Sequence, residues 1–241
     1  MSEQMAERLE DLQLRGLRIF TRGKAGAYTT DAVLLAHFAA ARQNERVCDL
    51  GMGGGILPLL LYGREASVQV TGLELQGELV SLARKSIAIN RLQDHISAIE
   101  GDIRHIRTLL PQKSFSLVVS NPPWFSDPQG DPARHQSLCA YQDIAEASAW
   151  LLNNGGRLCV CCPAAHLLQA AQAFRERRLE VKRLRFVASY ADRAPYLCLL
   201  EARLGARQGL ILLPQMNLYS GPGQFSTEYQ AIYHMEQEAA R

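Results

Sequence analysis

The chain has 241 residues, of which 47% are hydrophobic and 21% charged, and its formal net charge is +2. These values are typical of an ordinary soluble globular protein, and a charge this small neither demands nor excludes a nucleic-acid partner. The polar first residues are unlike a secretory leader, and no apolar run approaches the roughly 20 residues of a membrane helix. We therefore expect a cytoplasmic protein.

Short apolar runs alternate with amphipathic stretches along the chain. Strands are predicted at residues 46–50, 68–73, 96–100, 115–120, 157–162, 181–187 and 196–202, and helices at 56–62, 78–90, 144–152 and 164–177. Regular succession of strand and helix implies a parallel sheet covered on both faces. The last two strands are separated only by a turn near residues 190–195, so we expect them to form an antiparallel hairpin at the sheet edge.

The predicted fold class is therefore α/β and Rossmann-like, with a mostly parallel seven-stranded sheet and one antiparallel edge strand. We expect a single domain over residues 1–241. Residues 1–44 would form an N-terminal extension that contributes to the binding site, residues 45–205 the core, and residues 206–241 a C-terminal tail.

Six cysteines lie mostly inside predicted strands. The C-V-C-C run at residues 159–162 has no second cysteine pair and no nearby histidine pair, so we expect no zinc or other metal site. Free cysteines in such positions behave as small buried hydrophobic residues. The six are Cys48, Cys139, Cys159, Cys161, Cys162 and Cys198.

A glycine-rich loop follows the first strand directly, and its sequence from Asp49 to Gly55 fits D-x-G-x-G-x-G. Glycines allow the backbone to approach a ligand closely, and the helix that follows offers free N–H groups. The acid that opens the loop would repel a pyrophosphate but can accept a hydrogen bond from an ammonium group. Dinucleotide enzymes use related loops, so the motif alone indicates only a cofactor site.

Two further acids follow later strands. Glu74 ends the second strand, where a carboxylate can accept both hydroxyls of a ribose. Asp102 follows the third strand, where it can accept a hydrogen bond from an adenine amino group. Ordinary strand-end acids are the alternative for both positions. Together with Asp49, Gly51 and Gly53 they indicate a cofactor that contains adenosine.

The sequence Asn121-Pro122-Pro123-Trp124 follows the fourth strand, at the sheet edge where open α/β sheets bind ligands. The two prolines remove two backbone donors and stiffen the loop. The Pro122 carbonyl and the Asn121 side-chain oxygen then form a pair of acceptors suited to an –NH2 group. Trp124 offers a ring on which a planar base can stack. A rigid turn with a core tryptophan is the alternative.

This acceptor pair suits one kind of chemistry. An exocyclic amino nitrogen is a poor nucleophile because its lone pair is delocalised into the ring. Two hydrogen bonds to fixed acceptors favour a more tetrahedral nitrogen and stabilise its growing positive charge, and alignment with an electrophile supplies the rest. No strong general base is required.

The glycine loop, the later acid and NPP before an aromatic residue resemble N6-adenine and related amino-methyltransferases. Other segments are similar to those of the bacterial tRNA1(Val) adenine-37 N6-methyltransferase family, over about Leu14 to Tyr233. That family usually has Tyr in place of Trp124 and Glu in place of Gln136. The similar segments are Tyr28-Thr29-Thr30-Asp31-Ala32-Val33-Leu34-Leu35, Ala133-Arg134-His135-Gln136, and Gly221-Pro222-Gly223-Gln224-Phe225-Ser226 with Tyr229.

The resemblance implies the class I methyltransferase fold, S-adenosyl-L-methionine as cofactor, and methylation of the N6 amino group of adenine in RNA, with tRNA as the expected substrate. Asn121, Pro122, Pro123 and Trp124 would be the catalytic residues. The cofactor would be bound by Thr30 and Asp31 at its methionine end, with Asp49, Gly51, Gly53, Glu74, Asp102 and Asn121 completing its site.

Basic residues gather in two stretches that we expect to contact RNA phosphates. Solvated faces of helices and edge strands are the alternative. The target adenine would have to be flipped out or presented in a loop. The stretches are Arg15, Arg18, Arg22 and Lys24, and then Arg175, Arg177, Arg178, Lys182, Arg183 and Arg185.

Two other functions remain open at this point. Protein glutamine N5-methyltransferases also use NPP with an aromatic residue, but they carry a helical substrate-binding domain before the glycine loop, whereas 48 residues precede Asp49 here. The third interpretation is a non-catalytic RNA-binding protein of the same fold, against which the intact cofactor and acceptor motifs argue.

Overall fold

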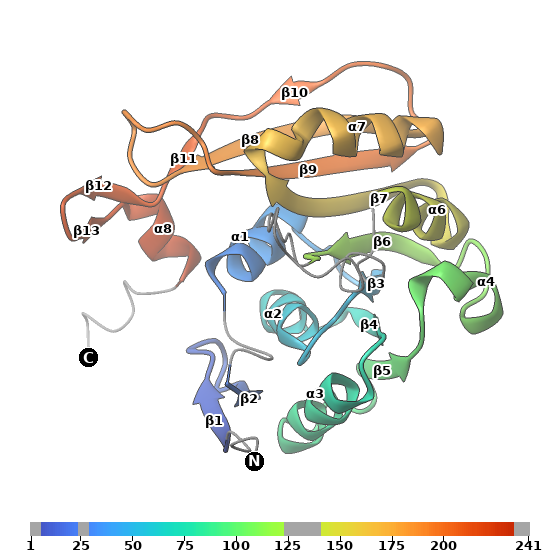
Figure 1. Cartoon of the computed structure of the whole chain (residues 1–241). Coiled ribbons are helices and arrows are strands. Elements are labelled where there is room, and N and C mark those ends of the chain that lie inside the picture. The colour runs from blue at the N-terminus through green and yellow to red at the C-terminus, as the bar shows by residue number, and fades with distance from the viewer. Residues whose placement is uncertain (1–5, 24–28, 123–140, 234–241) are drawn as a thin grey trace, which may run out of the picture.

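The computed structural model describes residues 6–23, 29–122 and 141–233. A single large sheet runs through the molecule, with helices packed on both of its faces (Figure 1). Two apolar layers fill the space on either side of the sheet. One layer involves the helices α1 (Thr30–Ala39), α2 (Ile56–Arg64) and α3 (Gly77–Ile89), and the other α4 (Ile106–Leu109), α6 (Tyr141–Leu151) and α7 (Leu167–Glu176).

The strands of the large sheet follow the order β10-β8-β9-β7-β6-β3-β4-β5, and β11 also pairs with β8. From β7 to β5 all neighbours are parallel, and β9 is antiparallel to both β7 and β8. The strand order reverses where β3 lies between β4 and β6. The bounds are β3 (Arg46–Leu50), β4 (Gln69–Glu74), β5 (Ile96–Glu100), β6 (Phe115–Ser120), β7 (Leu152–Pro163), β8 (Leu179–Ala188) and β9 (Leu197–Leu204).

All seven predicted strands are present, so the predicted α/β class is confirmed, with two corrections. The reversed strand β9 lies between β7 and β8 instead of at the sheet edge, and hydrogen-bonded neighbours on both sides account for its nearly complete burial. Within the described residues the sheet also has nine strands, because β10 (Ile211–Leu212) and β11 (Met216–Asn217) pair with the outer side of β8. Two-residue strands are too short for a period-two pattern to reveal.

The four predicted helices correspond to α2, α3, α6 and α7, of which α7 follows the short 3-10 helix η2 (Ala164–His166). Helix α1 was not predicted as a helix, nor were α4, the 3-10 helix η1 (Ile103–His105) before it, and α8 (Thr227–Ile232). The predicted turn at residues 153–156 falls within β7. The pairing with β6 shifts register there, and Gly155 has a φ of 75°.

Five described cysteines are free and buried, as predicted for packing residues, and Cys139 lies outside the described part. Two small hairpins flank the core. They are β1 (Glu7–Asp11) with β2 (Arg18–Arg22), and β12 (Tyr219–Gly221) with β13 (Gln224–Phe225).

Five aromatic rings form a continuous stack beside the last hairpin. Successive centroids are 5.3, 5.2, 4.7 and 4.5 Å apart along the order Tyr190, Tyr219, Phe225, Tyr229 and Tyr233. We call this stack the aromatic ladder. It joins the turn between β8 and β9 to the last hairpin and α8, which packs against α1 (Figure 1).

Candidate functional site

The glycine-rich loop connects β3 to α2 at the carboxyl edge of the parallel strands. Gly51, Gly53 and Gly55 have φ values of 81°, 55° and 93°, a region that residues with a Cβ rarely occupy. The amides of Gly51 and Met52 both donate to the Leu73 carbonyl, at 2.8 and 3.1 Å. The loop is therefore held against the end of β4, and its glycines are needed for its conformation.

Glu74, the last residue of β4, braces the same loop. One carboxylate oxygen accepts from the Gly53 amide at 2.9 Å and the other from the Gln76 amide at 3.0 Å. Each carboxylate oxygen can accept a second hydrogen bond, so the pair retains capacity for two hydroxyl donors.

Asp49 is the most unusual group of the site. Its carboxylate is fully buried at the end of β3, and neither oxygen has a hydrogen-bond partner in the described structure. Burial, and then the negative charge of Glu74, raise the pKa of Asp49 well above its ordinary value. Buried polar groups in folded proteins are nearly always hydrogen-bonded. The unpaired Asp49 carboxylate beside the glycine-rich loop therefore fits a ligand with a positively charged hydrogen-bond donor.

Asp102 follows β5 and caps η1. Its carboxylate accepts from the Arg104 amide at 2.9 Å and forms an ion pair with the Arg104 guanidinium. This hydrogen-bonded arginine lowers the pKa of Asp102. The predicted contact with an adenine amino group would have to be made beside Arg104.

Asn121 lies one residue beyond the end of β6, next to the point where the strand order reverses. Its side-chain oxygen accepts a hydrogen bond from the Cys161 thiol, with 2.8 Å between sulfur and oxygen. The preceding residue, Ser120, donates its hydroxyl to the Leu50 carbonyl at 2.7 Å. Asn121 is thus held between the ends of β3 and β7. Pro122 is buried, whereas Pro123, Trp124 and residues 133–136 lie outside the described residues.

Thr30 and Asp31 begin α1, whose N-cap Thr29 accepts from the Ala32 amide. Both side chains are half-buried, and burial raises the pKa of Asp31. The negative charge of Asp31 acts on Cys161 and on Tyr196, and in both it raises the pKa in addition to the larger effect of burial. Asn121 thus contacts the Cys161 thiol directly, and the charge of Asp31 acts on the same thiol.

Cys161 and Tyr196 are site neighbours that sequence reasoning missed. The sequence predicts Cys161 only as a packing residue, and Tyr196, which is 41% exposed, only as part of a strand. The parallel register pairs Ser120 with Val160, so the next residues, Asn121 and Cys161, are level across β6 and β7. That register was the signal that could have identified Cys161.

The two basic stretches differ in how their side chains are engaged. In the first, Arg15 and Arg18 are exposed, Arg22 forms an ion pair with Glu7 at 2.6 Å, and Lys24 lies outside the described residues. In the second, Arg178 is exposed and Lys182 donates to the Arg207 carbonyl. The other four form ion pairs, which are Arg175–Glu180, Arg177–Glu146, Arg183–Glu201 and Arg185–Glu228.

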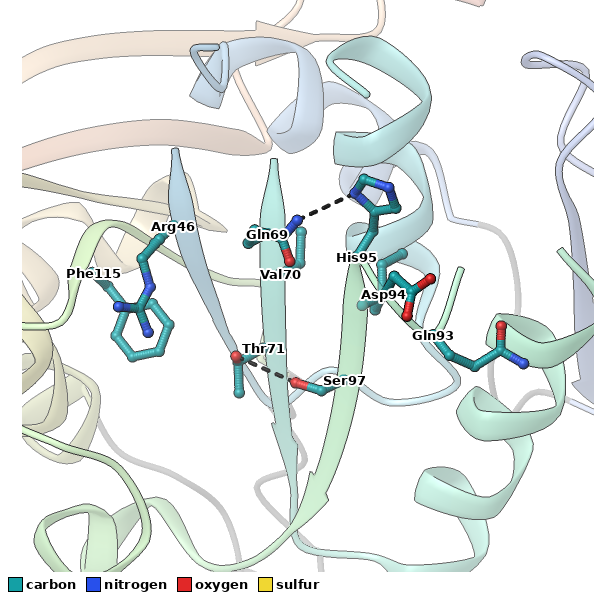
Figure 2. Close-up of a pocket in the computed structure, with 10 residues that line it drawn as sticks. Arg46, Gln69, Val70, Thr71, Gln93, Asp94, His95, Ser97 and Phe115 are labelled. Atoms are coloured by element: carbon teal, nitrogen blue, oxygen red, sulfur yellow. Dashed lines mark hydrogen bonds between the residues drawn. The ribbon is translucent and has the colours of Figure 1, made fainter. Parts of the chain in front are cut away.

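A pocket of about 320 Å³ lies elsewhere, at the amino ends of the parallel strands (Figure 2). It is lined by residues that begin β3, β4, β5 and β6, including Arg46, Gln69 and Phe115. The glycine loop and Asn121 are at the opposite ends of these strands, so this pocket is separate from the candidate site. In the described part of the chain, no cluster of three metal-ligating side chains occurs and no helix is long and apolar enough to span a membrane.

Comparison with known proteins gives this geometry a family. The model of the methyltransferase small domain family matches residues 19–187. A tRNA1(Val) (adenine(37)-N6)-methyltransferase from Porphyromonas gingivalis is 30% identical over a region that covers 72% of this chain and 73% of that protein. One of the same name from Erwinia tasmaniensis is 29% identical over 56% of this chain, and the chain spans 58% of that relative.

Solved structures agree on the fold. The structure of a predicted O-methyltransferase from Agrobacterium tumefaciens superposes with a TM-score of 0.72 at 20% sequence identity, covering 85% of this chain and 96% of that one. The family match and this likeness confirm the expected class I fold, and S-adenosylmethionine is the cofactor. The chain belongs to the methyltransferase small domain family, and within it to the group of the tRNA1(Val) (adenine(37)-N6)-methyltransferases.

Proposed function

We propose that this chain methylates the exocyclic N6 amino group of an adenine in RNA, and that the RNA is a tRNA. The observation that carries the proposal is the placement of Asn121, whose side-chain oxygen is fixed at the carboxyl edge of the sheet by Cys161. The names of the relatives, which specify adenine 37 of tRNA1(Val), support the same substrate class.

The bound cofactor supplies an electrophilic methyl group on a positively charged sulfur. The chain's own part in the reaction is to orient the amino nitrogen. In this proposal the Asn121 oxygen and the Pro122 carbonyl each accept one N–H bond of the adenine amino group. Pro123 would stiffen the loop and Trp124 would stack on the base. Fixed acceptors stabilise positive charge as it develops on nitrogen without any reorganisation.

The cofactor site proposed here consists of Thr30, Asp31, Asp49, Gly51, Gly53, Glu74, Asp102 and Asn121. The orphaned Asp49 oxygens support its role as acceptor for the cofactor's ammonium group. The second lone pairs of the Glu74 carboxylate support a role at the ribose hydroxyls, because each oxygen has one protein donor.

RNA is proposed to contact the two basic stretches, mainly through side chains that are free to reach phosphates. Arg15, Arg18 and Arg178 are exposed, whereas Arg183 and Arg185 are held by Glu201 and Glu228. We also propose that the chain acts as one domain, in which residues 1–44 and 206–241 flank the core and border the site.

Incorporation of label from S-adenosylmethionine into total tRNA tests the function, followed by mass spectrometry of the nucleosides. We expect N6-methyladenosine, and a loss of about 100-fold in rate for Asn121→Ala, as when a fixed transition-state partner is removed. Asn153→Ala, at an exposed asparagine of β7, is the matched control. Equal incorporation by Asn121→Ala would contradict the role of Asn121, and label in protein instead of RNA would contradict the substrate.

A further inference from the structure

The strongest feature beyond the proposed site is the contact between Asn121 and a buried thiol on the neighbouring strand. Cys161 is fully buried in β7, and its sulfur is 2.8 Å from the side-chain oxygen of Asn121. Asn121 is partly exposed, whereas Cys161 is not. The thiol therefore lies behind the group that is proposed to meet the substrate.

The sheet explains why these two residues meet. In the parallel pairing of β6 with β7, Ser120 is level with Val160, and the chain leaves the strand at the next residue. Cys161 continues in β7 and pairs with Leu199 of β9 on its other side, so its backbone is fixed by two neighbours. A rigid donor therefore stands beside an asparagine that is no longer held by strand pairing.

The hydrogen bond also determines the orientation of the amide. An asparagine side chain has an acceptor oxygen at one end and a donor NH2 at the other, and rotation by half a turn exchanges them. A thiol hydrogen directed at the oxygen stabilises only one of these orientations. Because a carbonyl oxygen has two lone pairs, one can accept from the thiol while the other remains available for an N–H of the substrate.

We propose that Cys161 is a positioning residue, which holds the Asn121 amide with its oxygen available to the amino group that is methylated. This inference rests on the proposed function. It assigns a role to a side chain that does not touch the substrate and that has no place in the motifs of the sequence.

The thiol can serve as a donor only while it is protonated. Burial, and then the negative charge of Asp31, raise the pKa of Cys161 well above the ordinary value. At neutral pH the group is therefore a thiol. A thiolate at the same place could not donate and would repel the Asn121 oxygen.

Steady-state kinetics on tRNA with three variants test the inference. Cys161→Ala removes the donor and should lower kcat roughly three- to ten-fold, as expected for one neutral hydrogen bond, with little change in KM. Cys161→Ser keeps a donor and should retain most of the activity. Cys159→Ala is the matched control, since Cys159 is equally buried and lies on the same face of β7 two residues earlier.

A double variant separates positioning from packing. In the Asn121→Ala background, Cys161→Ala should have no further effect on kcat, because the side chain that it orients is gone. An equal loss of kcat in Cys161→Ala and Cys159→Ala would overturn the inference, as would additive effects in the double variant.

An infrared measurement tests the hydrogen bond even if the protein methylates no RNA. The S–H stretching band of Cys161 is identified by subtracting the spectrum of Cys161→Ala from that of the intact chain. We expect this band to shift when Asn121→Ala removes the acceptor. An unchanged band would refute the contact itself. Absence of methylation together with a shifted band would refute only the proposed function.

Discussion

Replacing Asp49 with asparagine should stabilise the protein and weaken its binding of cofactor. The carboxylate is fully buried, and neither oxygen is hydrogen-bonded in the described structure. An unsatisfied buried polar group costs on the order of 1–3 kcal/mol, and more when it is charged. Asp49→Asn removes the charge at nearly constant volume, so we expect the free energy of unfolding at neutral pH to rise by about 1–3 kcal/mol.

The raised pKa of Asp49 determines how the stability of the protein changes with pH. The pKa of Asp49 is raised in the folded protein, so the unfolded chain loses this proton at lower pH than the folded one does. The folded state then binds more protons, and stability falls as the pH rises from the unfolded pKa, near 3.9, to the folded pKa. This loss should be absent in Asp49→Asn. The difference between the two proteins should therefore grow from pH 4 upward.

Urea unfolding at a series of pH values, with and without S-adenosylmethionine, measures both effects. Cofactor should stabilise the wild-type protein more than the variant, because stabilisation by a ligand rises with the logarithm of its affinity for the folded state. A variant less stable than the wild type at neutral pH would show that Asp49 has a stabilising partner, and the reasoning would be wrong.

Two further predictions concern buried contacts along the sheet. Gly72→Ala would place a Cβ against the buried Met52 side chain, so we expect the free energy of unfolding in urea to fall by about 1–3 kcal/mol. Partial recovery of this stability in Gly72→Ala/Met52→Ala would confirm that the clash is the cause. No recovery would count against it. Arg157→Ala leaves the buried carboxylate of Glu45 without its arginine partner and removes one of the three arginines paired with Glu201, so it should cost about 3–5 kcal/mol. Arg203→Ala, which removes a more exposed partner of Glu201, should cost under about 1 kcal/mol; equal losses would refute this explanation.

The seven core strands could be predicted from the sequence because they are short segments between clear breaks, most of them largely apolar and β8 with apolar and charged residues in alternation. The predicted position of the reversed strand at the sheet edge was wrong. The apolar sequence of β9, from Leu197 to Leu204, indicates that the strand is buried but not which strands lie beside it. Helix α1 was not predicted, although Thr29 and Asp31 are typical of a helix start. Its own apolar residues occupy all sides of the helix, so the sequence shows little helical periodicity.

The residues of the candidate site could be predicted where a single segment contains the reactive or binding side chains. They were harder to predict where the site depends on a contact between two segments. Asp49 lies at the carboxyl end of β3 and Asn121 directly follows β6, so the general rule for open α/β sheets locates them. Cys161 could be recognised only from the register between β6 and β7. Likewise, Asp102 forms an ion pair with Arg104, and Arg183 forms one with Glu201. No pattern in the sequence predicts either ion pair.

The aromatic ladder should couple the local unfolding of the segments that it joins. Its rings belong to the turn between β8 and β9 and to the segment from Tyr219 to Tyr233, and each ring is covered by the next. Removing any one segment would expose the ring faces of its neighbours to water, at a cost that grows with the apolar area uncovered. Turn and tail should therefore exchange their amide hydrogens together, as one cooperative unit.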